Sequence, residues 1–106
     1  MELLNEICGP KEKCLEPLPK NEAARLSEEV PQWRTRDEHL QREFKFAGFA
    51  QAMEFVNKVA RVADAQDHHP DIYISYNKVV LTLFTHKVNA LTKNDFIMAA
   101  RIDAIK

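Results

Sequence analysis

Three of the four histidines, His68, His69 and His86, lie close enough in the sequence to share one site. An imidazole has an ordinary pKa of about 6.5, so it can donate or accept a proton near neutral pH. It is also a common ligand of zinc. The three histidines therefore leave three interpretations open: acid/base catalysis, a metal site, or a solvated polar loop.

Nearby carboxylates fit these interpretations to different degrees. Asp71 could join the histidines, whereas Asp64 and Asp67 also suit a helix end and a loop. Asp95 also suits the first turn of a helix. A zinc site of two or three histidines plus one carboxylate is the least favoured, because adjacent histidines rarely converge on one ion. No serine or cysteine lies in a nucleophile motif, so covalent catalysis has little support.

A predicted hairpin has two of the histidines, His69 and His86, at its open end. Residues 72–76 and 79–85 are rich in β-branched and aromatic side chains, which is typical of strands. Asn77 and Lys78 separate the two segments, and asparagine tolerates the left-handed conformation that a two-residue turn needs. The segments therefore predict an antiparallel pair.

The register of this pair follows from its turn. If Tyr76 pairs with Val79, then His69 faces His86, and directly opposed residues have Cβ atoms about 4.5–5.5 Å apart. Pro70 disfavours regular pairing at that end of the hairpin. We therefore expect the histidines to line the rim of a pocket where the hairpin frays.

The first part of the chain predicts a helix and another hairpin. Residues 21–30 suit a short helix with Asn21 as its N-cap, and Pro31 should end it. Residues 33–37 and 39–46 have strand character, and apolar and polar side chains alternate along the second segment. The second segment should therefore be a half-buried strand with one face exposed to solvent.

Two further helices complete the domain. Residues 49–64 give the strongest helical pattern, with apolar side chains at steps of three and four: Phe49, Ala52, Met53, Val56, Val59, Ala60 and Ala63. Thr92 and Asp95 form a capping-box pattern that opens a last helix. The order α-β-β-α-β-β-α predicts an α+β fold, a four-stranded antiparallel sheet with three helices packed on one face.

Length and composition narrow the class of protein. The chain has 106 residues, and we expect residues 1–20 to form an irregular arm and residues 21–106 one folded domain. The net charge of -1 argues against a nucleic-acid binder, and two glycines are too few for a phosphate-binding loop. The apolar runs are too short to span a membrane, and the N-terminus does not have the pattern of a signal peptide. Cys8 and Cys14 are expected to be free thiols rather than zinc ligands, as in a cytoplasmic protein.

The spacing of these residues resembles the signature of one family, the pterin-4a-carbinolamine dehydratases. The pattern in this chain is Asp64-x3-His68-His69-Pro70-x5-Tyr76-x9-His86-x8-Asp95-Phe96. The similarity continues through LQREFKF, FAQAMEFVNKVA, HHPDI, YNKVVLTLFTH and LTKNDF, and covers roughly residues 22 to 104. The resemblance favours acid/base catalysis over the other two interpretations.

The resemblance implies a reaction and roles for individual residues. The family dehydrates 4a-hydroxytetrahydropterin to the quinonoid dihydropterin, and so recycles the cofactor of aromatic amino-acid hydroxylases. His68 and His86 would be the general acid/base pair, and His69, Asp64, Pro70 and Asp95 would bind substrate. An acid must protonate the departing hydroxyl and a base must take the N5 proton. Neither a metal nor another cofactor is expected, and the small-molecule partner would be a pterin.

The resemblance also leaves alternatives and departures. Some relatives are dimerisation partners of transcription factors, and others resemble pterin-binding chaperones of molybdopterin enzymes. Asp64 stands where many relatives have glutamate, and Asn89-Ala90 where glycine is common. The family implies a homodimer joined through sheet edges, or a homotetramer of two such dimers packed through helices. We expect residues 40–46, long and aromatic, to be the edge strand that pairs.

Overall fold

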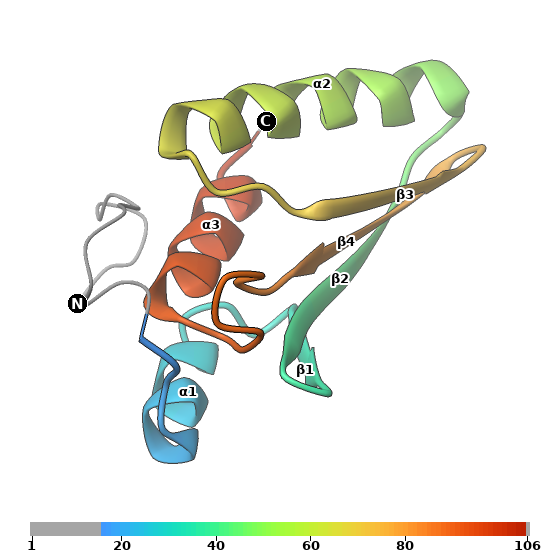
Figure 1. The fold of residues 1–106 in the computed structure, drawn as a ribbon. Helices are drawn as coiled ribbons and strands as arrows, with labels where there is room; N and C mark the ends of the chain where they lie inside the picture. Colours follow the sequence, from blue (N-terminus) through green and yellow to red (C-terminus); the bar gives the residue numbers. More distant parts are fainter. Residues whose placement is uncertain (1–15, 106) are drawn as a thin grey trace.

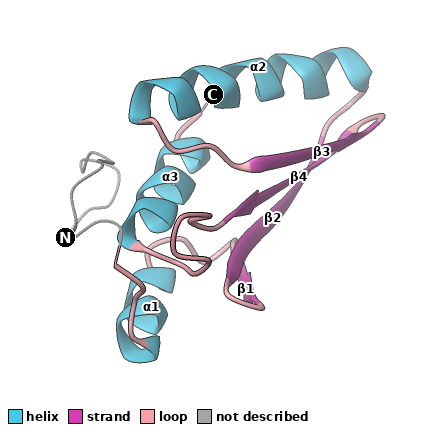
Figure 2. Ribbon diagram, in the orientation of Figure 1, coloured by secondary structure: helices cyan, strands magenta, loops and turns pink. Residues whose placement is uncertain are grey.

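The computed structural model describes residues 16–105 as one antiparallel sheet with the helices on one side of it (Figure 1, Figure 2). The elements in chain order are α1 (Lys20–Ser27), β1 (Arg34–Arg36), β2 (His39–Lys45), α2 (Phe49–Gln66), β3 (Asp71–Ser75), β4 (Lys78–Leu83) and α3 (Lys93–Asp103). All strand pairs are antiparallel. The predicted α+β class and element order are confirmed.

Helix α1 begins before the predicted N-cap. Pro19, in an extended conformation, is the N-cap, and its carbonyl accepts the N–H of Ala23. The prediction of Asn21 as the N-cap is therefore wrong. A proline lacks only an N–H, and its carbonyl can still accept the first helical hydrogen bond. The helix ends at Ser27, and a tighter turn follows in which Val30 donates its N–H to the Ser27 carbonyl.

The strands lie in the order β1-β2-β4-β3, which corrects the expected edge. Strand β2 is interior, with β1 on one side and β4 on the other. The prediction that residues 40–46 form a free edge is wrong, because the chain crosses through α2 and returns β4 beside β2. The edges are β1, of three residues, and β3, of five.

The β3–β4 hairpin turns one residue earlier than predicted. Ser75 pairs with Lys78, so the two residues between them form the turn. The predicted pairing of Tyr76 with Val79 is wrong, because Ile74 pairs with Val79. The register is displaced by two residues from the expected one. The side chains therefore keep their faces, but every cross-strand partner changes.

Hydrogen bonds to the end of β2 anchor this turn. Asn77 donates its side-chain amide to the Phe46 carbonyl at 3.0 Å, and Phe46 donates its N–H to the Asn77 carbonyl at 2.8 Å. Tyr76, not Asn77, takes the positive φ, at 53°. Such a φ is uncommon for a bulky residue, so composition alone favoured the wrong turn.

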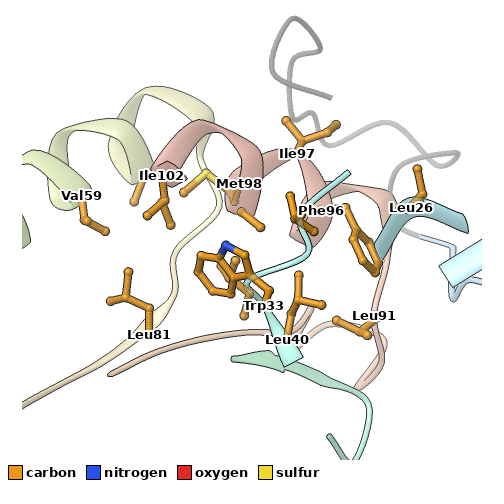
Figure 3. Packing of buried hydrophobic residues seen from close by; sticks show 14 of the residues in the cluster. Leu26, Trp33, Leu40, Val59, Leu81, Leu91, Phe96, Ile97, Met98 and Ile102 are labelled. Carbon is orange, nitrogen blue, oxygen red and sulfur yellow. The ribbon is translucent and has the colours of Figure 1, made fainter. Parts of the chain in front are cut away.

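The core fills the space between the inner face of the sheet and helices α2 and α3 (Figure 3). Along β4, alternate residues Val79, Leu81 and Leu83 are buried. Figure 3 places Trp33 beside Leu40 in the same cluster. The uncovered face of the sheet carries the side chains between these, which are half-buried or exposed.

Helix α2 has more apolar surface than the core uses. Ala52, Val59 and Ala63 are buried, as the periodicity predicted. Phe49, which the same pattern placed in the core, is 52% exposed, and Ala60 is exposed too. The apolar surface of Phe49 and Ala60 therefore lies outside the core.

Candidate active site

A buried carboxylate, that of Asp95, is the centre of the site. Asp95 has no exposed surface and lies in the first turn of α3. Its Oδ2 accepts the Thr92 N–H at 2.9 Å and the Thr85 hydroxyl at 3.0 Å. Its Oδ1 is 2.6 Å from His68 Nε2. A buried charge needs such partners to be stable, so these contacts fix the carboxylate in one position.

The predicted capping box of α3 is formed, and it leaves one oxygen of Asp95 free to contact His68. Thr92 is the N-cap, and Asp95 reaches back to its N–H through Oδ2. The hydroxyls of Thr85 and Thr92 are 2.7 Å apart and close the network on that side. Asp95 therefore secures the helix start with one oxygen and His68 with the other.

The end of helix α2 aims His68 toward this carboxylate. Asp67 takes the left-handed conformation, with φ 53° and ψ 41°, and His68 donates its N–H to the Ala63 carbonyl at 3.2 Å. This 6→1 bond after a left-handed residue is the usual way to close a helix and turn the chain. The His68 side chain is only 10% exposed, and it lies on the inner side of the sheet with Asp95.

The neighbouring His69 is held from the helix itself. Its Nε2 is 3.0 Å from Asp64 Oδ1. Both side chains are largely exposed, at 57% and 80%, so solvent weakens the attraction between them. Asp64, although shorter than a glutamate, therefore reaches His69.

His86 follows β4 and lies in the most open part of the site. Its Nε2 is 3.8 Å from Asp71 Oδ1, an ion-pair distance but too long for a hydrogen bond. Its ring also packs against Phe84, with the ring centroids 4.0 Å apart. The His86 side chain is 65% exposed.

The loop after β4 keeps its shape without glycine. Thr85 bridges to Ala90, and Asn89 has a φ of 52° inside the turn that they close. Asparagine is one of the few residues that adopts this left-handed conformation readily. The Asn89-Ala90 departure therefore fits a tight turn that holds His86 at its start.

The structure places each histidine beside a carboxylate, and no two of the three histidines face each other across paired strands. The prediction that His69 faces His86 is wrong, since the observed register ends with Asp71 opposite Thr82. Asp71, two residues beyond His69, is instead the residue beside His86. Each of the three histidines thus has its own aspartate. Pro70 is half-buried between His69 and β3.

Two contributors were not among the predicted site residues. Asp71 had been considered only as one of several nearby carboxylates, and its position depended on the hairpin register. Thr85 gave no sequence signal beyond its place before His86. Its role depends on a hydrogen bond to Asp95, ten residues away, and only the fold reveals this.

No group of three or more histidine, cysteine, aspartate or glutamate side chains within residues 16–105 has a geometry that could hold a metal ion. Each imidazole described above has one carboxylate neighbour, which gives two ligand groups of the three or four that zinc requires. Cys8 and Cys14 lie outside the described residues. No helix in the described range is long and apolar enough to cross a membrane.

The fold and site together define a class of protein. A small α+β domain holds imidazoles beside carboxylates, the arrangement by which enzymes orient a proton donor or acceptor. With no nucleophile motif in the sequence, the chemistry that these groups support is proton transfer.

Comparison with known proteins gives this class a family. Residues 16–105 match the model of the family described as pterin 4 alpha carbinolamine dehydratase. A protein of Rubrobacter xylanophilus, named "Putative pterin-4-alpha-carbinolamine dehydratase", is 41% identical over 105 residues, 98% of either chain. One of the same name from Picosynechococcus is 49% identical over 82 residues, 77% of this chain and 88% of that one. The chain belongs to the pterin-4a-carbinolamine dehydratase family of hydro-lyases.

Solved structures agree with this assignment. The transcriptional coactivator/pterin dehydratase from Brucella melitensis matches with a TM-score of 0.79 and 34% identity, over 84% of this chain and 97% of that chain. A pterin dehydratase-like protein, described as a RuBisCO assembly factor in the alpha-carboxysome, matches with a TM-score of 0.56 and 25% identity. That second match covers 68% of this chain and 83% of the other.

Proposed function

We propose that this chain removes water from 4a-hydroxytetrahydropterin to give the quinonoid dihydropterin. The C4a–O and N5–H bonds break, a C4a=N5 double bond forms, and the hydroxyl leaves as water with a proton from an acid. No electrons are gained or lost, so the step needs an acid and a base but no oxidant. Family membership and the three imidazoles of the site support this reaction.

The single observation that carries the mechanism is the 2.6 Å contact between His68 Nε2 and Asp95 Oδ1. An ionised carboxylate can only accept a hydrogen bond, so Nε2 carries the proton and Nδ1 keeps its lone pair. The carboxylate also stabilises the imidazolium that forms when Nδ1 accepts a proton. His68 is therefore the base that takes the N5 proton in our proposal.

His86 is the matching acid. Its exposed ring exchanges protons with solvent directly, so it can be reprotonated after each turnover. The Asp71 carboxylate is 3.8 Å away, too far for a hydrogen bond that would hold back the proton of His86. His86 then donates to the 4a-hydroxyl as the C4a–O bond breaks.

Of the other predicted residues, His69 and Pro70 would contact the substrate, and Asp95 would position His68. His69 is largely exposed beside Asp64, which supports a role in holding the substrate. Pro70, half-buried next to them, would form part of the wall of the site. Asp95 was expected to bind substrate, but its complete burial supports a positioning role toward His68 instead.

The direct experiment is a stopped-flow assay with chemically generated 4a-hydroxytetrahydropterin. The purified protein should accelerate the appearance of quinonoid dihydropterin well above the spontaneous rate. Equal rates with and without the protein would contradict the proposed dehydration. Recycling of a hydroxylase cofactor, the physiological role in our proposal, then requires that the protein raise the steady-state rate of a pterin-dependent aromatic amino-acid hydroxylase.

A second candidate is a protein-interaction role without catalysis, either as a transcription-factor dimerisation partner or as a chaperone of a molybdopterin enzyme. The Brucella melitensis protein is described as a transcriptional coactivator as well as a pterin dehydratase, and the second structural relative is described as a RuBisCO assembly factor. Exposed apolar side chains in this chain, such as Phe49 and Tyr73, are compatible with a protein partner. Absence of catalysis in the stopped-flow assay would favour this candidate.

A further inference from the structure

Three rings form a row on the uncovered face of the sheet, and His86 is at one end of it. Phe84 packs against His86 with ring centroids 4.0 Å apart and planes at 48°. On its other side Phe84 meets His39 of β2, with centroids 4.2 Å apart and planes at 74°. These tilted and edge-to-face geometries are the ones that aromatic pairs prefer.

The row follows directly from strand alternation. Leu83 and Thr85 are buried, so Phe84 between them projects from the opposite face, and its ring contacts that of His86 in the turn that follows. Extending the β2–β4 register by one residue places His39 opposite Phe84. The backbone register therefore places His39 beside Phe84, and the Phe84–His86 ring contact completes the row.

His86 needs such a neighbour more than the other histidines do. His68 is fixed by burial and by a 2.6 Å hydrogen bond. His86 has an exposed side chain, and its carboxylate neighbour is 3.8 Å away, too far to fix the plane of the ring. Contact with the Phe84 ring restricts rotation about χ1 and χ2, which a point charge at that distance does not.

We propose that Phe84 is a positioning residue that holds the His86 imidazole in the orientation for proton transfer, with His39 supporting Phe84 from behind. This inference rests on the role of His86 in the proposed function. Proton transfer depends steeply on the position of the donor, so a ring free to rotate spends less time in the productive geometry. The effect should fall on kcat, because Phe84 acts on His86 rather than on substrate affinity.

The test compares Phe84→Leu, which keeps an apolar side chain but loses the ring, with Phe84→Tyr, which keeps the ring. Phe84→Leu should lower kcat about 3- to 10-fold, the rate equivalent of one aromatic contact, with little change in KM. Phe84→Tyr should restore most of this loss. Tyr73→Leu is the matched control, since Tyr73 is also an exposed ring on this face, and it should leave kcat unchanged.

A spectroscopic arm separates this inference from the proposed reaction. The ring protons of His86, assigned by their loss in His86→Asn, should shift in the NMR spectrum of Phe84→Leu and remain near their wild-type position in Tyr73→Leu. Phe84 is half-buried and outside the hydrophobic core, so Phe84→Leu should fold, which circular dichroism verifies. If the wild type does not dehydrate the substrate, the proposed function fails, and the NMR arm then decides only whether the Phe84 and His86 rings are in contact; the orienting role also requires that the nuclear Overhauser effects from the His86 ring protons to its own β protons change in Phe84→Leu and not in Phe84→Tyr. Unshifted His86 resonances, or a kcat loss no greater than in Tyr73→Leu, would overturn the positioning role.

Discussion

The two histidines with proposed catalytic roles are held in opposite ways. His68 lies on the inner side of the sheet, almost fully buried, and is bonded to a carboxylate that has two further hydrogen-bond donors. His86 lies on the outer side, mostly exposed, with Asp71 at 3.8 Å and the Phe84 ring as neighbours. Charge and burial fix the first, whereas ring packing supports the second.

If His68 and His86 have the roles that we propose, this difference lets a small domain supply a base and an acid from the same residue type. A base that must accept a proton at a defined atom benefits from a fixed tautomer, which the Asp95 contact imposes on His68. An acid that must be reprotonated after each turnover benefits from access to water, which the exposed side chain of His86 has. Both demands are met in the segment after β4, because Thr85 is buried and bonded to Asp95 whereas the next residue, His86, is exposed.

Removal of either histidine should have the largest effect. His68→Ala and His86→Ala should each lower the dehydration rate about 10²- to 10⁴-fold, the usual contribution of a positioned acid or base. Stopped-flow measurement of each variant checks this. His39→Ala should change the rate by less than about threefold, because His39 contacts Phe84 and not His86 in the row of rings. Wild-type turnover in both His68 and His86 variants would refute the assignment of the pair.

The carboxylates should show the contrast between the two regions most sharply. Asp95→Asn should lower kcat about 10- to 100-fold, because an amide cannot accept from both His68 and its threonine partners as the carboxylate does. Asp71→Asn should cost less than about threefold, since the exposed, 3.8 Å pair contributes little.

The stability of the two variants provides the matching control. Asp95→Asn should also lower the free energy of unfolding by about 1–3 kcal/mol, since it disturbs a buried hydrogen-bonded network. Asp71→Asn should leave the midpoint of denaturant unfolding unchanged. Equal kinetic losses in the two variants would show that burial does not distinguish these histidines.

The parts of this picture that the sequence predicted are those that depend on local pattern. Element order and the capping box at Thr92 both follow from spacing that a few residues determine. The α+β class followed because strand and helix periodicities differ clearly in this chain.

The errors lie where distant contacts decide between local alternatives. Asn77 was the natural residue for the left-handed position of the turn, but its bond to Phe46 placed Tyr76 there instead. That displacement changed the hairpin register, so that Asp71, rather than His69, lies beside His86. Strand order was equally non-local, because nothing in residues 40–46 reveals that β4 returns to pair with them.

Assembly tests whether His86 stays as exposed in solution as in the single chain. The free edge of the sheet on this side is β3, which begins at Asp71, and Ile72 and Tyr73 on it are 40% and 58% exposed. We expect pairing of two β3 edges across a two-fold axis to form a dimer, and packing through α2, on which Phe49 is exposed, to form a tetramer. Such pairing would cover part of the region around Asp71. It would therefore reduce the exposure of His86 and make it more similar to that of His68.

A proline in β3 distinguishes this assembly from a monomer. Counting from the Ser75–Lys78 pair, Ile72 directs its N–H away from β4, so Ile72→Pro removes a donor from the free edge only. Light scattering at tens of micromolar protein should give a dimer or tetramer for the wild type and a smaller mass for Ile72→Pro. Ile72→Ala controls for the lost side chain, and a wild-type monomer mass would rule out the assembly.

Removal of metal should have the smallest effect of all. Each region pairs an imidazole with one carboxylate, His68 with Asp95 and His86 with Asp71, and neither pair supplies the third ligand of a zinc site. The proposed dehydration also needs only a proton donor and a proton acceptor. Prolonged dialysis against a chelator should therefore leave kcat unchanged, with metal content measured on the same sample. Stoichiometric zinc that is lost together with activity, and restores activity when added back, would instead favour a metal-assisted reaction.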